Sequence, residues 1–158
     1  VGRRWVSDFG NGVVRDVSLS DHKGKWVVFA WYPKDQTAVC QSELQQFEGL
    51  KGELSSRGAV LLAASCQGID TKKAWVEGEL GSTDIPLLAD VGGKVATDYG
   101  VFVAGAGISL RSTFIIDPEG VVKWHTDNFF NIGRSTDEIL RMLDALQSGG
   151  ACLVNWKK

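Results

Sequence analysis

Two apolar runs without polar alternation constrain the fold of this chain more than any other feature. Residues 26–32 read WVVFAWY, and residues 59–66 read AVLLAASC. A strand with one face in water carries polar residues at alternate positions, so unbroken apolar runs are typical of strands buried on both faces. Parallel strands of this kind are joined by helical crossovers that cover the sheet. The chain is therefore predicted to be an α/β protein.

Turn, cap and spacing signals predict the remaining elements. In chain order they are a β-hairpin from Arg4 to Leu19 around Gly10-Asn11-Gly12, a helix from Cys40 to about Arg57, a helix capped by Asp70 that runs toward Gly81, a short strand from Ile85 to Asp90, a short helix over residues 94–100, two antiparallel strands flanking Asp117-Pro118-Glu119-Gly120, and a last helix that begins with the capping pair Ser135 and Glu138.

This order of elements is that of a thioredoxin-like fold, with a central mixed sheet flanked by helices and an N-terminal β-hairpin. We find no internal repeat, linker or low-complexity segment in the 158 residues. The chain is predicted to form a single domain over residues 1–158. Residues 148–158 are predicted to be a flexible tail that carries Cys152.

Composition excludes several classes of partner. The net charge of −2 provides no electrostatic reason to expect nucleic acid or an anionic membrane. No apolar run approaches the roughly 20 residues that span a bilayer. The first ten residues lack the apolar core of a secretory signal. A cytoplasmic location is predicted, and an organellar one after removal of a transit segment before Val1 stays open.

The cysteines do not form a recognisable disulfide or metal pattern. There are three of them, Cys40, Cys66 and Cys152, and an odd count leaves at least one thiol free or paired between chains. Their spacing matches no zinc site, and His22 and His125 are isolated from them in sequence. No cofactor or metal is predicted, and the missing CxxC argues against a thioredoxin-type disulfide oxidoreductase.

Cys40 is the candidate for chemistry, because it lies at a helix start just beyond a buried strand. A lone cysteine is most often a small buried hydrophobe. Three features favour a nucleophile instead. Thr37 is placed to cap the helix and bring its hydroxyl beside the sulfur. The helix N-terminus favours a thiolate. Pro33 lacks an N–H and can wall the loop without competing for hydrogen bonds.

The spacing Pro33-x-x-x-Thr37-x-x-Cys40, followed by Glu43, resembles the active-site signature of the peroxiredoxins. Further similar blocks follow in the right order: IPLLAD (85–90), DYGV (98–101), RSTFIIDPEGVV (111–122), GRSTDEILR (133–141) and a tail cysteine shortly before Asn155-Trp156. The resemblance covers nearly the whole chain. It is greatest to the typical two-cysteine subgroup, which includes the alkyl hydroperoxide reductase peroxidases.

The resemblance implies a thiol-dependent peroxidase that reduces hydrogen peroxide and organic hydroperoxides. Cys40 would be the peroxidatic nucleophile, Thr37 would position the peroxide, and Pro33 would screen the sulfur from water. Arg111 would supply a permanent cation to the thiolate and the transition state. Without the resemblance, Arg111 reads as a solvated surface arginine.

Glu43 has two interpretations of equal weight. Its carboxylate lies one turn past Cys40, where alone it would disfavour a thiolate. If it pairs with an arginine, it orients that guanidinium and supports the site. Otherwise it is an ordinary exposed first-turn glutamate.

The resemblance also implies partners. The Cys40 sulfenic acid would form an intersubunit disulfide with Cys152, and a thioredoxin-like or dedicated reductant would reduce it. The edge strand around residues 123–130 would pair two subunits into a homodimer, and such dimers often form rings. Cys66 is interpreted as core packing, and an unengaged exposed Cys152 stays open. The rival function is a redox-sensing or holdase-type interaction module that uses the same thiol.

Overall fold

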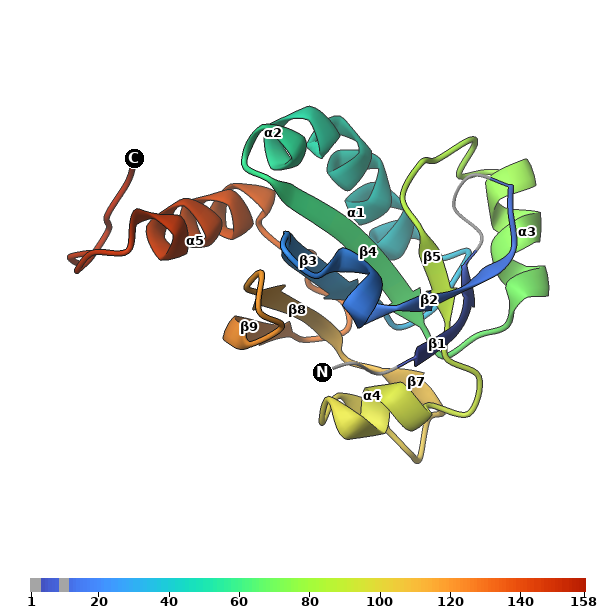
Figure 1. Cartoon of the computed structure of the whole chain (residues 1–158). Helices are drawn as coiled ribbons and strands as arrows, with labels where there is room; N and C mark the ends of the chain where they lie inside the picture. The colour runs from blue at the N-terminus through green and yellow to red at the C-terminus, as the bar shows by residue number, and fades with distance from the viewer. Residues whose placement is uncertain (1–3, 9–11) are drawn as a thin grey trace.

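The computed structural model describes residues 4–8 and 12–158, with side chains from residue 12 onward. These residues form nine strands, five α-helices and one 3₁₀ helix, with the helices placed around a central sheet (Figure 1). The strands are β1 (Arg4–Asp8), β2 (Arg15–Ser18), β3 (Trp26–Trp31), β4 (Ala59–Ser65), β5 (Leu87–Ala89), β6 (Phe102–Val103), β7 (Ile108–Ser109), β8 (Arg111–Ile116) and β9 (Val122–Asn128). The helices are η1 (Leu19–His22), α1 (Ala38–Gly49), α2 (Lys51–Ser56), α3 (Ile69–Glu77), α4 (Lys94–Asp98) and α5 (Thr136–Ser148).

The main sheet is mixed, as predicted, with the strand order β2-β1-β5-β4-β3-β8-β9. Strand β4 pairs in parallel with both β3 and β5, while β8 runs antiparallel to β3 and β9 antiparallel to β8. Both apolar runs form central strands, and every residue of β3 after Trp26 is buried. The prediction of strands buried on both faces is confirmed. The pair β6 and β7 forms a separate small sheet.

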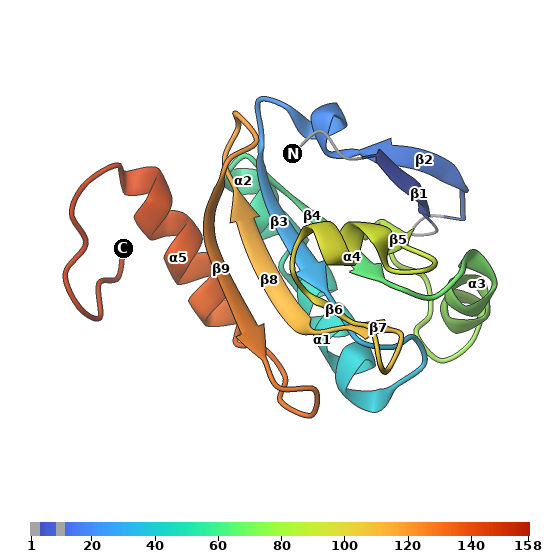
Figure 2. The same cartoon turned by 90° about the horizontal axis from the view of Figure 1, so that it is seen from below.

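Helices cover the two faces of the sheet unequally. One core cluster joins the sheet to α1, α2, α3 and α5 through side chains such as Phe47, Leu54, Trp75 and Leu143. The other joins the opposite face to α4 and η1 through Val95 and Leu19. Figure 2 shows α4 on one side of the sheet and α1 and α5 on the other. Within the described residues, no helix is long and apolar enough to cross a membrane.

Several predicted elements are confirmed from local signals. Strands β1 and β2 pair as an antiparallel hairpin, although Gly10 and Asn11 of its predicted turn lie outside the described residues. The strands on either side of Asp117-Pro118-Glu119-Gly120 form β8 and β9. Ser135 caps α5 by accepting the Glu138 backbone N–H at 3.2 Å. Strand β9 lies at the edge of the sheet.

Two predicted helices differ from the structure, one in its continuity and one in its N-cap. The helix expected from Cys40 to about Arg57 is divided into α1 and α2 at Leu50 (φ −91°, ψ −5°). The predicted cap Asp70 is the second residue of α3, and Gly68 occupies the N-cap position. An acidic side chain in the first turn is still favourable, because it interacts with the positive end of the helix dipole.

The sheet topology brings the end of β3 beside the start of β8. Ala30 pairs with Thr113, so the antiparallel register brings Arg111 level with Tyr32. The Ser109 hydroxyl donates to the Tyr32 carbonyl at 3.0 Å and ties the two segments together. The loop after Tyr32 leads directly into α1. Residues from the first and the last third of the chain therefore meet at the carboxyl end of β3.

The turn before α4 yields a first prediction. Gly93 has φ +70°, and a Cβ there would lie 2.2 Å from the ring of Phe102. Gly100 has a similar φ of +73°, with no described atom within 4 Å of its Cβ position. We expect Gly100→Ala to lower the free energy of unfolding by about 1–2 kcal/mol from backbone strain, and Gly93→Ala by about 2–4 kcal/mol because overpacking is added. Urea unfolding measures both. Equal losses of unfolding free energy in the two variants would contradict the close approach of Gly93 to the Phe102 ring.

Candidate active site

Cys40 is the third residue of α1 and lies beyond the carboxyl end of β3. Only 1% of its surface is exposed. The first turn of a helix presents backbone N–H groups without intrahelical partners and the positive end of the helix dipole. This environment favours an anionic sulfur at the point where the loop from β3 enters the helix.

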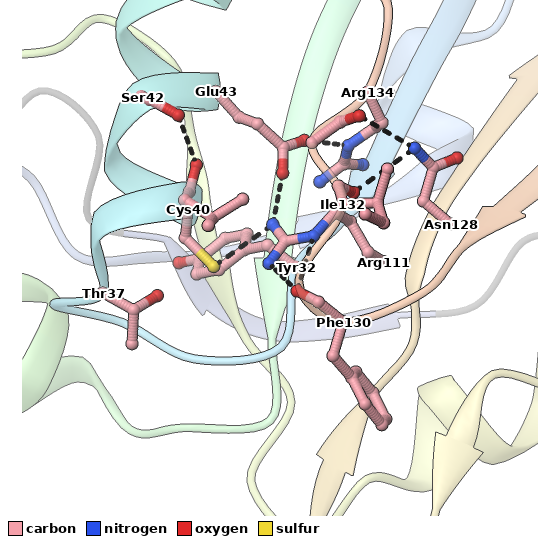
Figure 3. A network of polar contacts seen from close by, with 12 residues as sticks. Tyr32, Thr37, Cys40, Ser42, Glu43, Arg111, Asn128, Phe130, Ile132 and Arg134 are labelled. Carbon is pink, nitrogen blue, oxygen red and sulfur yellow. Dashed lines mark hydrogen bonds and ion pairs between the residues drawn. The ribbon is translucent and has the colours of Figure 1, made fainter.

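Arg111, the first residue of β8, points its guanidinium at this sulfur (Figure 3). Its Nη1 donates to Cys40 Sγ at 3.4 Å and also pairs with a Glu43 carboxylate oxygen. Its Nε and Nη2 donate to the Phe130 carbonyl at 3.2 and 2.6 Å. With 2% of its surface exposed, Arg111 is not the solvated surface arginine of the alternative interpretation.

Glu43 is buried between two guanidinium groups, the first of the two arrangements considered for it. Its Oε1 pairs with Arg111, and its Oε2 pairs with Arg134. The side chains of Glu43 and Arg134 are 5% and 2% exposed. Two guanidinium groups and one carboxylate leave one positive charge in excess beside the sulfur. Glu43 and Cys40 are three residues apart and share a helix face.

Arg134 is a site residue that sequence reasoning did not identify. It precedes α5, and its Nη1 donates to the Ser112 carbonyl at 2.9 Å and to Thr113 Oγ1 at 3.2 Å. Burial lowers the pKa of Arg134, and the Glu43 carboxylate opposes this shift. The only sequence signal was its position in the block GRSTDEILR, because no local spacing connects residue 134 with residue 43.

The structure corrects the prediction that the Thr37 side chain caps the helix. Thr37 is the N-cap residue with extended backbone, and its carbonyl accepts the Gln41 N–H at 2.9 Å. Its hydroxyl donates instead to the Lys34 carbonyl at 2.9 Å, because the intervening turn brings that carbonyl within reach. The half-buried Thr37 still lies at the start of the helix that carries Cys40. Pro33 is buried at the beginning of the same loop.

The other two cysteines have different environments. Cys66 is buried in the core, where burial and the nearby Asp90 raise the pKa of its thiol to about 12. Cys152 is exposed, with its sulfur 3.5 Å from Ser148 Oγ at the end of α5. Helix α5 begins just after Arg134 and is about 20 Å long, and Figure 1 shows the tail at its far end. One chain therefore does not bring Cys152 to Cys40.

The arrangement around Cys40 suits a nucleophilic sulfur. The helix start and the excess positive charge stabilise a thiolate. A guanidinium held in place can also stabilise the negative charge that develops on a leaving oxygen. Within the described part of the chain, no group of three or more His, Cys, Asp or Glu side chains is placed to hold a metal ion.

Comparisons with known proteins agree with this site. Residues 7–125 match the AhpC/TSA family. A peroxiredoxin of Schizosaccharomyces pombe is 41% identical over 94% of this chain and 82% of its own length. A thioredoxin peroxidase of Echinococcus granulosus is 42% identical over 93% of this chain and 81% of its own length. The crystal structure of the reduced 2-Cys peroxiredoxin of Plasmodium vivax superposes with a TM-score of 0.93 at 32% identity, covering 98% of this chain and 85% of that one.

The fold thus agrees with the solved relative, and the sequence is similar to those of peroxiredoxins over most of the chain. The chain belongs to the AhpC/TSA family of peroxiredoxins.

The buried carboxylate allows a test of the charge network. Glu43→Gln removes the counter-charge that two buried guanidinium groups share, so we expect the free energy of unfolding to fall by about 3–5 kcal/mol. The exposed Glu53, which pairs with Arg57 at 3.3 Å, provides the matched control. Glu53→Gln should cost less than about 1 kcal/mol. Urea unfolding at neutral pH measures the free energy of unfolding of both variants. Similar losses would show that the buried ion pairs stabilise the fold no more than the exposed pair does.

Proposed function

We propose that this protein is a thiol-dependent peroxidase in which Cys40 is the nucleophile that attacks the peroxide. The observation that carries the proposal is the contact of 3.4 Å between Arg111 Nη1 and Cys40 Sγ at the start of α1. Family membership supports it, since relatives at about 40% identity include a peroxiredoxin and a thioredoxin peroxidase.

The first step oxidises sulfur and reduces peroxide by two electrons. The Cys40 thiolate attacks the hydroxyl oxygen of ROOH, an S–O bond forms, and the O–O bond breaks. The sulfur becomes a sulfenic acid, and RO⁻ takes a proton from solvent to leave as the alcohol, or as water when the substrate is hydrogen peroxide. Arg111 supports this step twice, because its guanidinium stabilises the thiolate and then the departing oxygen anion.

The second step would join two subunits. The Cys40 sulfenic acid condenses with the Cys152 thiol of a partner chain, forming the disulfide and releasing water. An external dithiol, thioredoxin or a dedicated reductant, then returns both cysteines to thiols and is itself oxidised. Cys40 is 1% exposed, so the start of α1 has to open before a second sulfur reaches it.

The partner chain is expected at the free edge of β9, which would pair two copies into a homodimer and allow rings of dimers. A cytoplasmic location stays a prediction. The peroxidase is favoured over the redox-sensing or holdase module, because the relatives at about 40% identity include a thioredoxin peroxidase.

Peroxide consumption with thioredoxin and thioredoxin reductase tests the proposal. We expect many turnovers for the wild type and none for Cys40→Ser. Arg111→Met removes one charged donor to the reacting atoms, so the rate constant with peroxide should fall about 10²–10³-fold. Cys66→Ala, in the core, serves as the control with retained turnover. A single oxidation per chain without turnover would favour the sensor instead.

A non-reducing gel after one equivalent of peroxide tests the disulfide. The wild type should form a covalent dimer that neither Cys40→Ser nor Cys152→Ser forms completely. Mixing the two variants provides a complementation check, since a Cys40 from one chain and a Cys152 from the other should still cross-link if subunits exchange. An intrachain disulfide identified by peptide mapping would refute the intersubunit assignment.

A further inference from the structure

A second buried ion pair lies outside the network of Arg111 and Glu43. Asp35 belongs to the loop between β3 and α1, and Lys72 belongs to α3. Their residues are 3% and 0% exposed. Lys72 Nζ lies 3.2 Å from Asp35 Oδ2 and 3.4 Å from Oδ1. A lysine is almost never fully buried unless it is paired, so this pair needs an explanation.

The pair is saturated with hydrogen bonds. Lys72 Nζ also donates to Ser65 Oγ at 2.6 Å and to the Gln67 carbonyl at 3.0 Å. The Asp35 carboxylate accepts from Thr71 Oγ1 at 2.6 Å and from Ser65 Oγ at 3.0 Å. The Asp35 backbone N–H donates to Gln67 Oε1 at 2.6 Å. The carboxylate of this loop residue is therefore held by the end of β4 and by α3, and its backbone N–H by Gln67 between them.

The charges of the pair depend on each other. Burial lowers the pKa of Lys72, and the Asp35 carboxylate opposes this shift. The ammonium also lies 5.7 Å from the ring centroid of Tyr32, the residue that directly follows β3. Removing either charge would leave the other without its counter-charge in the interior.

The loop that the pair holds carries backbone strain. Gln36 directly follows Asp35 and has φ +61°, a left-handed conformation that is unfavourable for a residue with a Cβ. Its side-chain amide donates to the Thr71 carbonyl at 3.3 Å. Strained residues persist where the surrounding contacts determine them, and they are frequent at active sites. Helix α1 begins two residues later, with Cys40 in its first turn.

A further contact connects the same helix to α3. Trp75 Nε1 donates to Gln41 Oε1 at 3.2 Å, and Gln41 directly follows Cys40. Lys72 and Trp75 are three residues apart and lie on one face of α3. That face thus contacts the chain on both sides of Cys40, at Asp35 in the loop and at Gln41 in α1.

We propose that Asp35 and Lys72 are positioning residues for Cys40, and that their ion pair holds the strained loop so that the first turn of α1 presents the sulfur to Arg111. This inference rests on the proposed peroxidase function. Neither residue touches the reacting atoms, and both act through the backbone of the loop.

The proposal predicts that a loosened loop slows the first chemical step and does not slow the second. Attack on peroxide needs the sulfur in contact with Arg111, so a loosened loop slows it. Disulfide formation needs the start of α1 to open, so a loosened loop leaves it as fast or makes it faster. A general loss of stability has no reason to separate the two steps in this way.

The experiment is a single turnover of the reduced full-length protein with hydrogen peroxide. The reaction is quenched at set times with a thiol-alkylating reagent, and mass spectrometry counts Cys40 as thiol, sulfenic acid and disulfide. Lys72→Met keeps the length of the side chain and removes its charge. Arg57→Met is the matched control, because it breaks the ion pair of Arg57 and Asp144 (2.7 Å), which lies outside the loop, β4 end and α3 contacts that hold Asp35.

We expect Lys72→Met to lower the rate constant for sulfenic acid formation by about 10–100-fold, as misplacement of reacting groups does. Its disulfide step should be at least as fast as in the wild type, and Arg57→Met should match the wild type in both steps. A wild-type first step in Lys72→Met, or the same loss in Arg57→Met, would overturn the inference.

Thr71→Val decides the matter if Lys72→Met does not fold. It removes one hydrogen bond to Asp35 Oδ2 and leaves both charges in place. A several-fold slower first step with an unslowed second step supports the inference, and unchanged rates reject it. A wild-type protein that reacts no faster than free cysteine would instead reject the proposed function, so the two failures are distinguishable.

Discussion

The candidate site depends on one carboxylate held between two buried guanidinium groups. Arg111 and Arg134 would each be costly to bury alone, and their like charges would repel. Glu43 bridges them and still leaves one positive charge in excess next to Cys40. Sulfur and carboxylate lie on one face of α1, so the helix that carries the nucleophile also carries the group that orients its cation. The chemistry at the sulfur thus depends on an ion pair one turn away.

The loop before α1 lies between two charged networks with different tasks. On one side, Arg111 contacts the sulfur itself. On the other, Lys72 and its neighbours hold Asp35, whose backbone leads into the strained Gln36. Both networks are buried, so the loss of one charged partner from either would destabilise the fold. Both also act on the same short segment, the loop before α1 and its first turn. Such a segment can be well ordered for one reaction step and still be the place where the fold opens for the next.

Local signals predicted most of the fold and failed where a competing local partner was present. The apolar runs, the Asp117–Gly120 turn and the Ser135 cap each act within a few residues, and each forms the predicted element. The Thr37 hydroxyl, by contrast, donates to a nearby carbonyl and not to the helix. The cap of α3 is a glycine two residues before Asp70. A cap residue type therefore predicts that a helix starts nearby but does not determine which hydrogen bond its side chain makes.

The sequence by itself determined the α/β class, the strands buried on both faces and the placement of Cys40 at a helix start, because these follow from periodicity and spacing along the chain. Only the tertiary structure decided which charges meet. Glu43 is separated from Arg111 by 68 residues and from Arg134 by 91, and Asp35 from Lys72 by 37. Such pairings follow from the order of strands in the sheet, which brings distant segments to one end of β3 and leaves no mark in the local pattern.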